Sequence, residues 1–133
     1  VQTPIAQLLR KNANFLGEAF VAGTLFDLGR YPGLITNKQT KSKVTGHLFE
    51  IPNTELIFPV LDEYEGVDGF NPDRNGVEYR REIIEVSHQN ALLTSWTYLY
   101  NLPTKGLKII ESGNYLEYLQ KNREYQRFIN QIE

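Results

Sequence analysis

The segment from Leu61 to Gly66 holds the densest group of side chains that could transfer protons. Three carboxylates fall within four positions, at Asp62, Glu63 and Glu65. Leu61 and Tyr64 are spaced so that both lie on one face of a helix, and Gly66 is suited to end it as a C-terminal cap. We therefore predict a short helix whose last turn carries the acids.

The chemistry of these acids follows from their place at the end of a helix. The helix dipole is negative at that end, so the charged form of a carboxylate is disfavoured and its pKa should rise. An acid with a raised pKa can accept and return protons near neutral pH, which is the requirement of general acid–base catalysis. The alternative is that all three acids are solvated surface residues.

The composition is that of a globular protein and disfavours several kinds of function. The chain has 133 residues, of which 41% are hydrophobic and 23% charged, and its formal net charge is −2. One domain is therefore expected, without a basic surface for nucleic acid. There is no cysteine, and the two histidines lack metal-ligand spacing, so we expect no metal. No bilayer-length apolar run and no signal-peptide pattern occur, so we expect a cytoplasmic protein without a membrane partner.

Apolar periodicity and turn residues predict an α+β domain. The expected helices run from Pro4 to about Asn12, from about Thr54 through the acidic segment, and onward from Asn114. The expected strands are Phe15–Phe26, Lys43–Ile51, Tyr79–Ser87 and Leu92–Tyr100, the last two forming a hairpin around His88–Asn90. Pro59 should kink the second helix or divide it into two short turns. This order of elements implies a mostly antiparallel sheet.

Two loops and one helix start could form the walls of a binding site. Asp27–Gly33 is rich in turn residues, and Tyr31, Pro32 and Gly33 could line a pocket or belong to a plain loop. Tyr115 follows the expected cap of the last helix and is open to the same two interpretations. Residues 67–78 have the length of a lid or a specificity loop. Structural packing is the more common role for His47 and for the aromatic row Trp96, Tyr98 and Tyr100.

Several segments together resemble the gamma-glutamylcyclotransferase-like (avirulence-induced-gene-like) family. They are Phe15–Ala19, Gly23–Leu34, Val44–Phe49, Leu61–Gly66, Tyr79–Arg81, Ser95–Tyr98 and Glu111–Tyr115. No single segment is decisive, but they occur in the order that the family has them. The resemblance covers nearly the whole chain.

The resemblance implies a fold and a reaction. The fold would be a small mixed, mostly antiparallel β-barrel with flanking helices. The reaction would need no cofactor and would release an amine or amino acid from a small gamma-glutamyl compound, leaving 5-oxoproline. By position, Glu65 matches the family's catalytic glutamate, which would take a proton from the substrate's α-ammonium and then protonate the leaving nitrogen. Asp62 and Glu63 do not match the catalytic position.

The sequence departs from the family at its beginning. Members carry a first strand with a Tyr-Gly-Ser/Thr-Leu motif, whose backbone N–H groups bind the substrate and polarise its carbonyl. The nearest string, Ala22–Leu25, falls on the second strand instead. The motif would precede Pro4, and the chain also contains no methionine. We therefore expect residues 1–133 to be a single domain without its first strand, which would remove the oxyanion donors.

Three functions are therefore open. The first is a gamma-glutamyl cyclotransferase-like enzyme, with Glu65 as the catalytic residue and Tyr31, Pro32, Gly33 and Tyr115 as substrate-binding residues. The second is a non-catalytic binding or interaction domain on the same fold, because fold does not imply function. The third is an unrelated small α+β ligand-binding domain. The sequence leaves the oligomeric state open.

Overall fold

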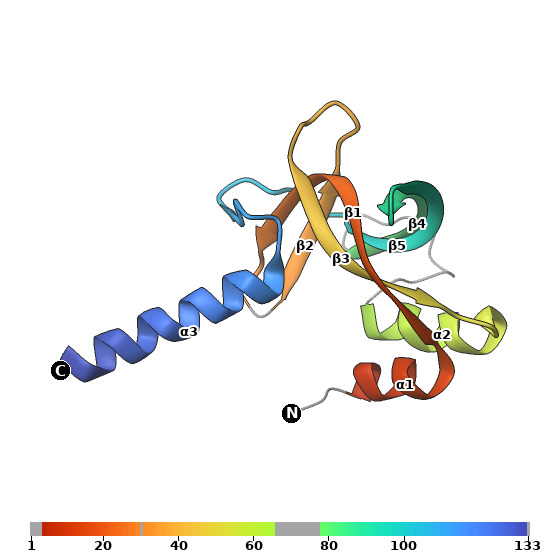
Figure 1. Cartoon of the computed structure of the whole chain (residues 1–133), viewed down its shortest axis with the longest axis horizontal. Helices are drawn as coiled ribbons and strands as arrows, with labels where there is room; N and C mark the ends of the chain where they lie inside the picture. The colour runs from red at the N-terminus through yellow and green to blue at the C-terminus, as the bar shows by residue number, and fades with distance from the viewer. Residues whose placement is uncertain (1–3, 30, 66–77, 133) are drawn as a thin grey trace.

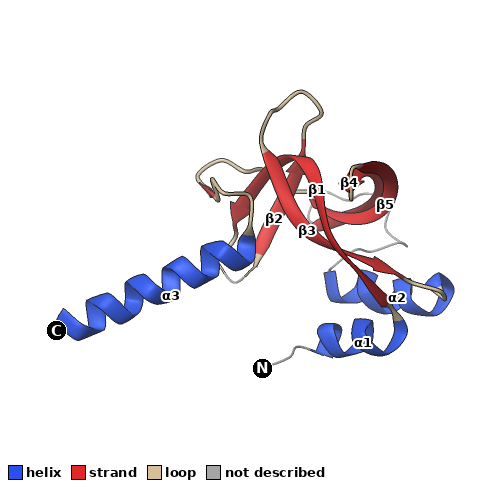
Figure 2. Cartoon of the chain, in the orientation of Figure 1, coloured by secondary structure: helices blue, strands red, loops and turns tan. Residues whose placement is uncertain are grey.

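The computed structural model describes residues 4–29, 31–65 and 78–132, without the side chains of residues 4–6, 10, 64, 65 and 124–132. Its elements, in chain order, are α1 (Pro4–Asn12), β1 (Asn14–Asp27), β2 (Pro32–Thr36), β3 (Lys43–Glu50), α2 (Thr54–Glu65), β4 (Tyr79–His88), β5 (Ala91–Tyr100), β6 (Lys108–Ile109) and α3 (Tyr115–Ile132). Figures 1 and 2 show a coiled sheet with α1 and α2 near one end and α3 extending from the other. The predicted α+β class is confirmed.

Strand β1 is the centre of the sheet. Its first part pairs with β3, its last five residues pair with β2, and Phe26 and Asp27 also pair with β6. It meets β4 at one pair, Phe20 with Ser87. All of these pairings are antiparallel, as the order of elements implied. One strand therefore joins both ends of the molecule.

Strands β4 and β5 form a long hairpin. They pair in register from Tyr79 with Tyr100 to His88 with Ala91. Gln89 and Asn90 form the turn with φ values of 50° and 66°, the left-handed pair that a tight two-residue hairpin requires. The hairpin was predicted, but His88 belongs to the strand rather than to the turn.

Strand β2 was not predicted. The sequence suggested a loop over Asp27–Gly33, but the connection is shorter, and Pro32 begins a strand paired with β1. The turn closes through the Leu28 N–H, which donates to the Tyr31 carbonyl at 3.0 Å, and the Gly29 N–H, which donates to Asp27 at 2.7 Å. Proline is tolerated because it is the first residue of a strand at the end of the sheet.

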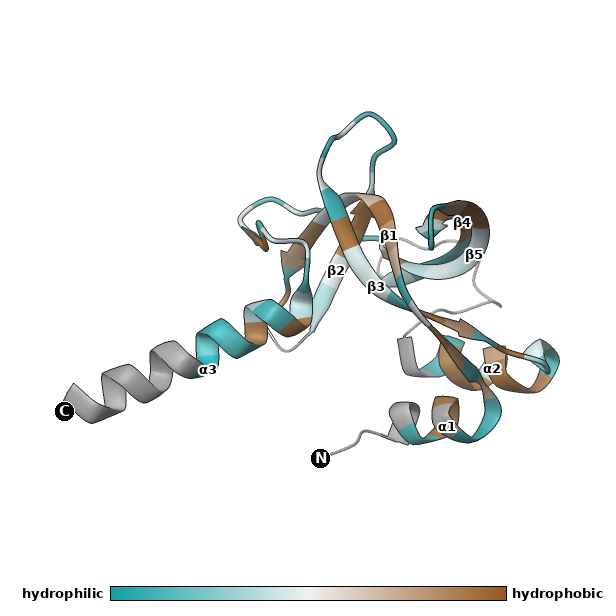
Figure 3. Cartoon of the chain, viewed as in Figure 1, coloured by the Kyte–Doolittle hydropathy of each residue, from teal (hydrophilic) through white to brown (hydrophobic). Residues whose placement is uncertain are grey.

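The described buried hydrophobic residues lie along the sheet and on α2, and one cluster of them lies where β1, β3 and the start of α3 meet. Leu25, Val44 and Ile110 are buried together there, and four partly buried residues pack on them: Val21, Leu34, Tyr115 and Tyr118. Figure 3 shows hydrophobic residues along the strands and α2, and hydrophilic residues in the loop between β2 and β3.

Helix α2 is continuous from Thr54 to Glu65, so Pro59 does not divide it into two. Proline removes one backbone N–H and crowds the preceding turn, but Ile57 and Leu61 are both buried. Their burial on one face holds the helix together across the proline.

Helix α3 begins as predicted. The Glu117 N–H donates to the Asn114 side chain at 3.1 Å, which is an N-cap. Lys121 and Glu117 form an ion pair one turn apart, at 3.0 Å. Among the described helices, none combines the length and the apolar character needed to cross a membrane.

Candidate active site

Glu65 is the last residue of α2. Its side chain, Gly66 and residues 67–77 lie outside the described part of the structure. The assignments of Glu65 as the catalytic residue, of Gly66 as the helix cap and of the following loop as a lid or a specificity loop therefore remain predictions.

Asp62, three residues before Glu65, is held by two strands. The Arg81 guanidinium donates to both of its carboxylate oxygens, from Nε at 2.9 Å and from Nη2 at 3.2 Å. The Tyr98 hydroxyl donates to the same carboxylate at 2.6 Å. Arg81 is on β4 and Tyr98 is its cross-strand neighbour on β5. These contacts fasten the second half of α2 to the hairpin, whereas Glu63 is exposed.

The Arg81 guanidinium also packs against two aromatic rings. Its central carbon is 4.1 Å from the Phe58 ring centroid and 4.5 Å from the Trp96 ring centroid. The two rings are themselves in edge contact, with centroids 5.8 Å apart. The predicted aromatic row thus splits: Trp96 and Tyr98 bind residues of this network, while Tyr100 is buried. The network was not predicted from the sequence, although Asp62 and Arg81 both lie in segments that resemble the family.

The predicted pocket residues Tyr31, Pro32 and Gly33 lie beside the start of β4. The Tyr79 hydroxyl donates to the Pro32 carbonyl at 2.7 Å, and the Tyr31 and Tyr79 ring centroids are 6.3 Å apart. Gly33 is packed so closely that an added Cβ would lie 3.0 Å from both Leu28 and Tyr100. Tyr79 is the first residue of β4, so this cluster is fixed to the hairpin that also holds α2.

Tyr115 belongs to a different cluster. It packs on the core of Leu25, Val44 and Ile110 and stacks on Tyr118 with ring centroids 6.5 Å apart. Burial, and then the negative charge of Asp27, raise the pKa of Tyr115. Asp27 accepts a hydrogen bond from the Tyr118 hydroxyl at 2.7 Å and is the first residue of the turn that leads to Tyr31. The assignment of Tyr115 as a substrate-binding residue near Glu65 remains a prediction.

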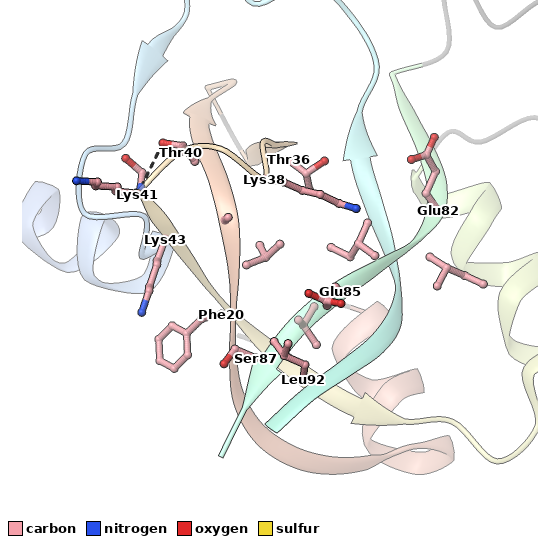
Figure 4. Close-up of a pocket in the computed structure, with 16 residues that line it drawn as sticks. Phe20, Thr36, Lys38, Thr40, Lys41, Lys43, Glu82, Glu85, Ser87 and Leu92 are labelled. Atoms are coloured by element: carbon pink, nitrogen blue, oxygen red, sulfur yellow. Dashed lines mark hydrogen bonds between the residues drawn. The ribbon is translucent and has the colours of Figure 1, made fainter. Parts of the chain in front are cut away.

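We consider three cavities that described residues line. The largest, about 750 Å³, is a groove between β1, the loop after β2, and β4 (Figure 4). The second, about 390 Å³, lies between β3 and the start of α3 and is lined by His47 and Tyr115. The third, about 300 Å³, lies against α2 beside Asp62 and Arg81. The described residues contain no group of three metal-binding side chains.

Comparison with known proteins identifies the class. The family described as gamma-glutamyl cyclotransferase, AIG2-like, matches residues 2–117. The chain belongs to this family, as the resemblance indicated.

The similar proteins include two bacterial ytfP proteins and one bacterial structure of lower identity. The gamma-glutamylcyclotransferase family protein ytfP of Citrobacter rodentium is 35% identical over 107 residues, covering 80% of this chain and 79% of that protein. The solution structure of ytfP from Escherichia coli superposes with a TM-score of 0.58 at 31% identity, covering 83% of each chain. YkqA from Bacillus subtilis has a TM-score of 0.65 at 19% identity, covering 89% of this chain and 37% of that one, and shares the fold alone.

Proposed function

We propose that the protein is a cofactor-independent gamma-glutamyl cyclotransferase that releases 5-oxoproline and an amine or amino acid from a small gamma-glutamyl compound. The observation that carries this proposal is the family match over residues 2–117, which includes Glu65. The position of Glu65 supports it, because this residue ends a helix that the hairpin holds in place through Asp62.

In the proposed reaction Glu65 first accepts a proton from the substrate and later returns one to the leaving group. Its carboxylate accepts a proton from the α-ammonium of the substrate, and the freed amine attacks the γ-carbonyl carbon to close a five-membered ring. Glu65 then returns the proton to the leaving nitrogen as the bond from that carbon to this nitrogen breaks, and the ring nitrogen passes its second proton to the released amine. The products are 5-oxoproline and a free amine, and no oxidant or metal is consumed. This is general acid–base catalysis by a single carboxylate.

The oxyanion formed at the γ-carbonyl needs donors, and we propose that a strand carrying a Tyr-Gly-Ser/Thr-Leu motif supplies them. Support comes from β4, which pairs with β5 along its length but with β1 at only one residue. Among the described residues, no strand pairs with the remaining edge of β4. Such an edge is a template for another strand. The groove in Figure 4 runs along this edge, past Ile84 and Val86.

The direct test measures 5-oxoproline release from a panel of gamma-glutamyl amines and gamma-glutamyl dipeptides. Two proteins are assayed: the chain of residues 1–133, and the same chain extended with the residues that its gene encodes before Val1. We expect the extended chain to be active and the shorter chain to be at least ~10²-fold slower, the loss typical of one missing oxyanion donor. If neither protein releases 5-oxoproline from any compound, the proposal is wrong.

The Glu65→Gln substitution tests the residue assignment. Glutamine keeps the size and the hydrogen-bonding capacity of the side chain but cannot accept the proton, so kcat/KM should fall by ~10²–10⁴-fold. The melting temperature should change little. Glu63→Gln is the matched control, because it removes an exposed carboxylate from the same helix. Full activity in Glu65→Gln would exclude Glu65 as the catalytic base.

A non-catalytic binding domain is the second candidate. The observation that favours it is the open edge of β4 with its groove of about 750 Å³, since a sheet edge can bind an extended peptide. Calorimetric titration of the extended chain with the same panel separates the two functions. Binding without turnover favours the binding domain, and turnover favours the enzyme.

A further inference from the structure

We propose that Asp62, Arg81 and Tyr98 are positioning residues for the cyclotransferase reaction, which hold the last turn of α2 at a fixed place on the β4–β5 hairpin. This inference rests on the proposed role of Glu65. The three residues do not touch the substrate in this scheme. They act through the helix backbone that ends at Glu65.

The first argument is distance along the helix. Asp62 and Glu65 are three residues apart on one helix, which is about 4.5 Å along its axis. A constraint on Asp62 is therefore a constraint on the backbone of Glu65. The helix also buries Ile57 and Leu61, but these apolar contacts alone would not fix its rotation. The hydrogen bonds to Asp62 are directional and do fix it.

The second argument is the quality of the network. The Asp62 carboxylate receives three hydrogen bonds, two of them from the fork of one guanidinium. The side chains of Arg81 and Asp62 are 23% and 22% exposed. By contrast, the Lys121–Glu117 pair on α3 has side chains 69% and 48% exposed, in that order, and one contact. Exposed pairs of that kind seldom fix geometry, whereas a forked, partly buried pair does.

The third argument is that the guanidinium itself cannot move freely. Phe58 lies 4.1 Å and Trp96 4.5 Å from its central carbon. Phe58 is on α2 and Trp96 is on β5, so the arginine joins the helix to both strands of the hairpin. Lysine could supply the charge but neither the planar stacking nor the forked hydrogen bonds.

The network also separates the roles of neighbouring acids. Both Asp62 oxygens are occupied by donors from β4 and β5, so this carboxylate is committed to structure. Glu65 is left to meet the substrate. A base must lie within hydrogen-bond reach of the proton that it takes, and a displacement of about 1 Å can cost ~10²-fold in rate. Fixing the helix end therefore has a catalytic consequence.

The test compares Asp62→Asn with Glu63→Gln in the active form of the protein. Each substitution removes one negative charge near Glu65, but only Asp62→Asn weakens the network. We expect Asp62→Asn to lower kcat by ~10-fold, short of the ~10²-fold cost of a full 1 Å displacement, with KM and the folded fraction nearly unchanged. Tyr98→Phe should give a smaller loss in the same direction. Glu63→Gln should match the wild type.

Two further measurements distinguish positioning from other roles. The acidic limb of the pH profile of kcat/KM should persist in Asp62→Asn and be lost in Glu65→Gln, because only Glu65 carries the proton. Amide hydrogen exchange in residues 61–65 should be faster in Asp62→Asn than in the wild type, while exchange in the first turns of α3 should be unchanged.

The possible failures are distinguishable. An active wild type with unchanged kcat in Asp62→Asn, or with equal losses in Asp62→Asn and Glu63→Gln, overturns the positioning role alone. Unchanged exchange at the end of α2 also overturns it. A wild type that turns over no gamma-glutamyl compound overturns the proposed function and this inference together.

Discussion

At the scale of single residues, the surroundings of each carboxylate decide what it does. Asp62 is bound by Arg81 and Tyr98, while Glu63, the next residue, is exposed. Asp27 has a third environment. A hydrogen bond from Tyr118, a second from the Gly29 N–H, and the charge of Lys108 hold the pKa of Asp27 below its usual value. The charged form of Asp27 is therefore stabilised in the folded protein.

This environment predicts a pH-dependent effect of Tyr118→Phe. Because the folded-state pKa of Asp27 is lowered, its ionisation stabilises the fold above the ordinary value of 3.8 and ceases to do so as pH falls through the lowered pKa. Removing the Tyr118 hydroxyl should cost about 0.5–1.5 kcal/mol of unfolding free energy at pH 7. Urea denaturation from pH 7 to pH 2 should show the cost shrinking below about pH 4. A cost that is constant or grows toward low pH would contradict the assignment.

The sequence allowed the acidic helix end to be predicted but not the partner of Asp62. The spacing of Leu61 and Tyr64 is a local signal, and both positions lie in α2 as that signal indicated. Arg81 is 19 positions away from Asp62, and nothing in local spacing says which of Arg80 and Arg81 faces α2. That choice depends on the register of β4 against β5. Resemblance to the family, rather than physics, singled out Glu65.

At the scale of elements, Gly113 joins α3 to the sheet. Its φ is +66°, and a Cβ there would collide with the Lys43 backbone carbonyl. Its own carbonyl accepts a hydrogen bond from the Thr45 N–H at 2.8 Å. The start of α3 is therefore pressed onto the start of β3, which places Tyr115 on the core.

We expect Gly113→Ala to be strongly destabilising. Alanine in a left-handed conformation costs of order 1–3 kcal/mol, and the collision with Lys43 adds to that cost. Gly106→Ala is the matched control, because Gly106 has a φ of +82° but nothing within 4 Å of the added Cβ. Thermal denaturation should show a larger loss for Gly113→Ala than for Gly106→Ala. Equal losses would mean that the contact with Lys43 contributes nothing.

Helices and strands with a strong local sequence pattern could be predicted. A strand defined by its pairing with a distant strand could not. The β4–β5 hairpin follows from alternation and a turn, so its strands were predicted nearly to the residue. Strand β2 is five residues long and is defined by its pairing with β1. Its sequence, Pro32–Thr36, contains both proline and glycine, which disfavour a strand. Tertiary pairing prevailed over local preference there.

At the scale of the whole molecule, β1 determines how cooperatively the sheet unfolds. It is 14 residues long and pairs with β2, β3, β4 and β6. By contrast, α1 lies at the edge of the molecule (Figure 1). A strand shared by four others cannot separate without disrupting the sheet, whereas a peripheral helix can open alone.

We therefore expect two classes of amide hydrogen exchange. Amides at the centre of β1, such as that of Gly23, should exchange only through global unfolding. The free energy of their exchange should therefore equal the free energy of unfolding measured by denaturation. Amides of α1, such as that of Leu9, should exchange through local opening at a lower free energy. Exchange of Leu9 as slow as that of Gly23 would show that α1 unfolds together with the sheet.

The stacking of Arg81 on Trp96 has a spectroscopic consequence. Trp96 is the only tryptophan in the chain, and its ring is 4.5 Å from the guanidinium that binds α2. Indole fluorescence changes with the charge and the water around the ring, so the emission of the whole protein reports on this one contact. Asp62→Asn should shift the emission maximum, whereas Glu63→Gln should not. A compound that moves α2 on binding would also shift the emission maximum. Ligands can therefore be screened by the fluorescence of the natural protein, without an added label.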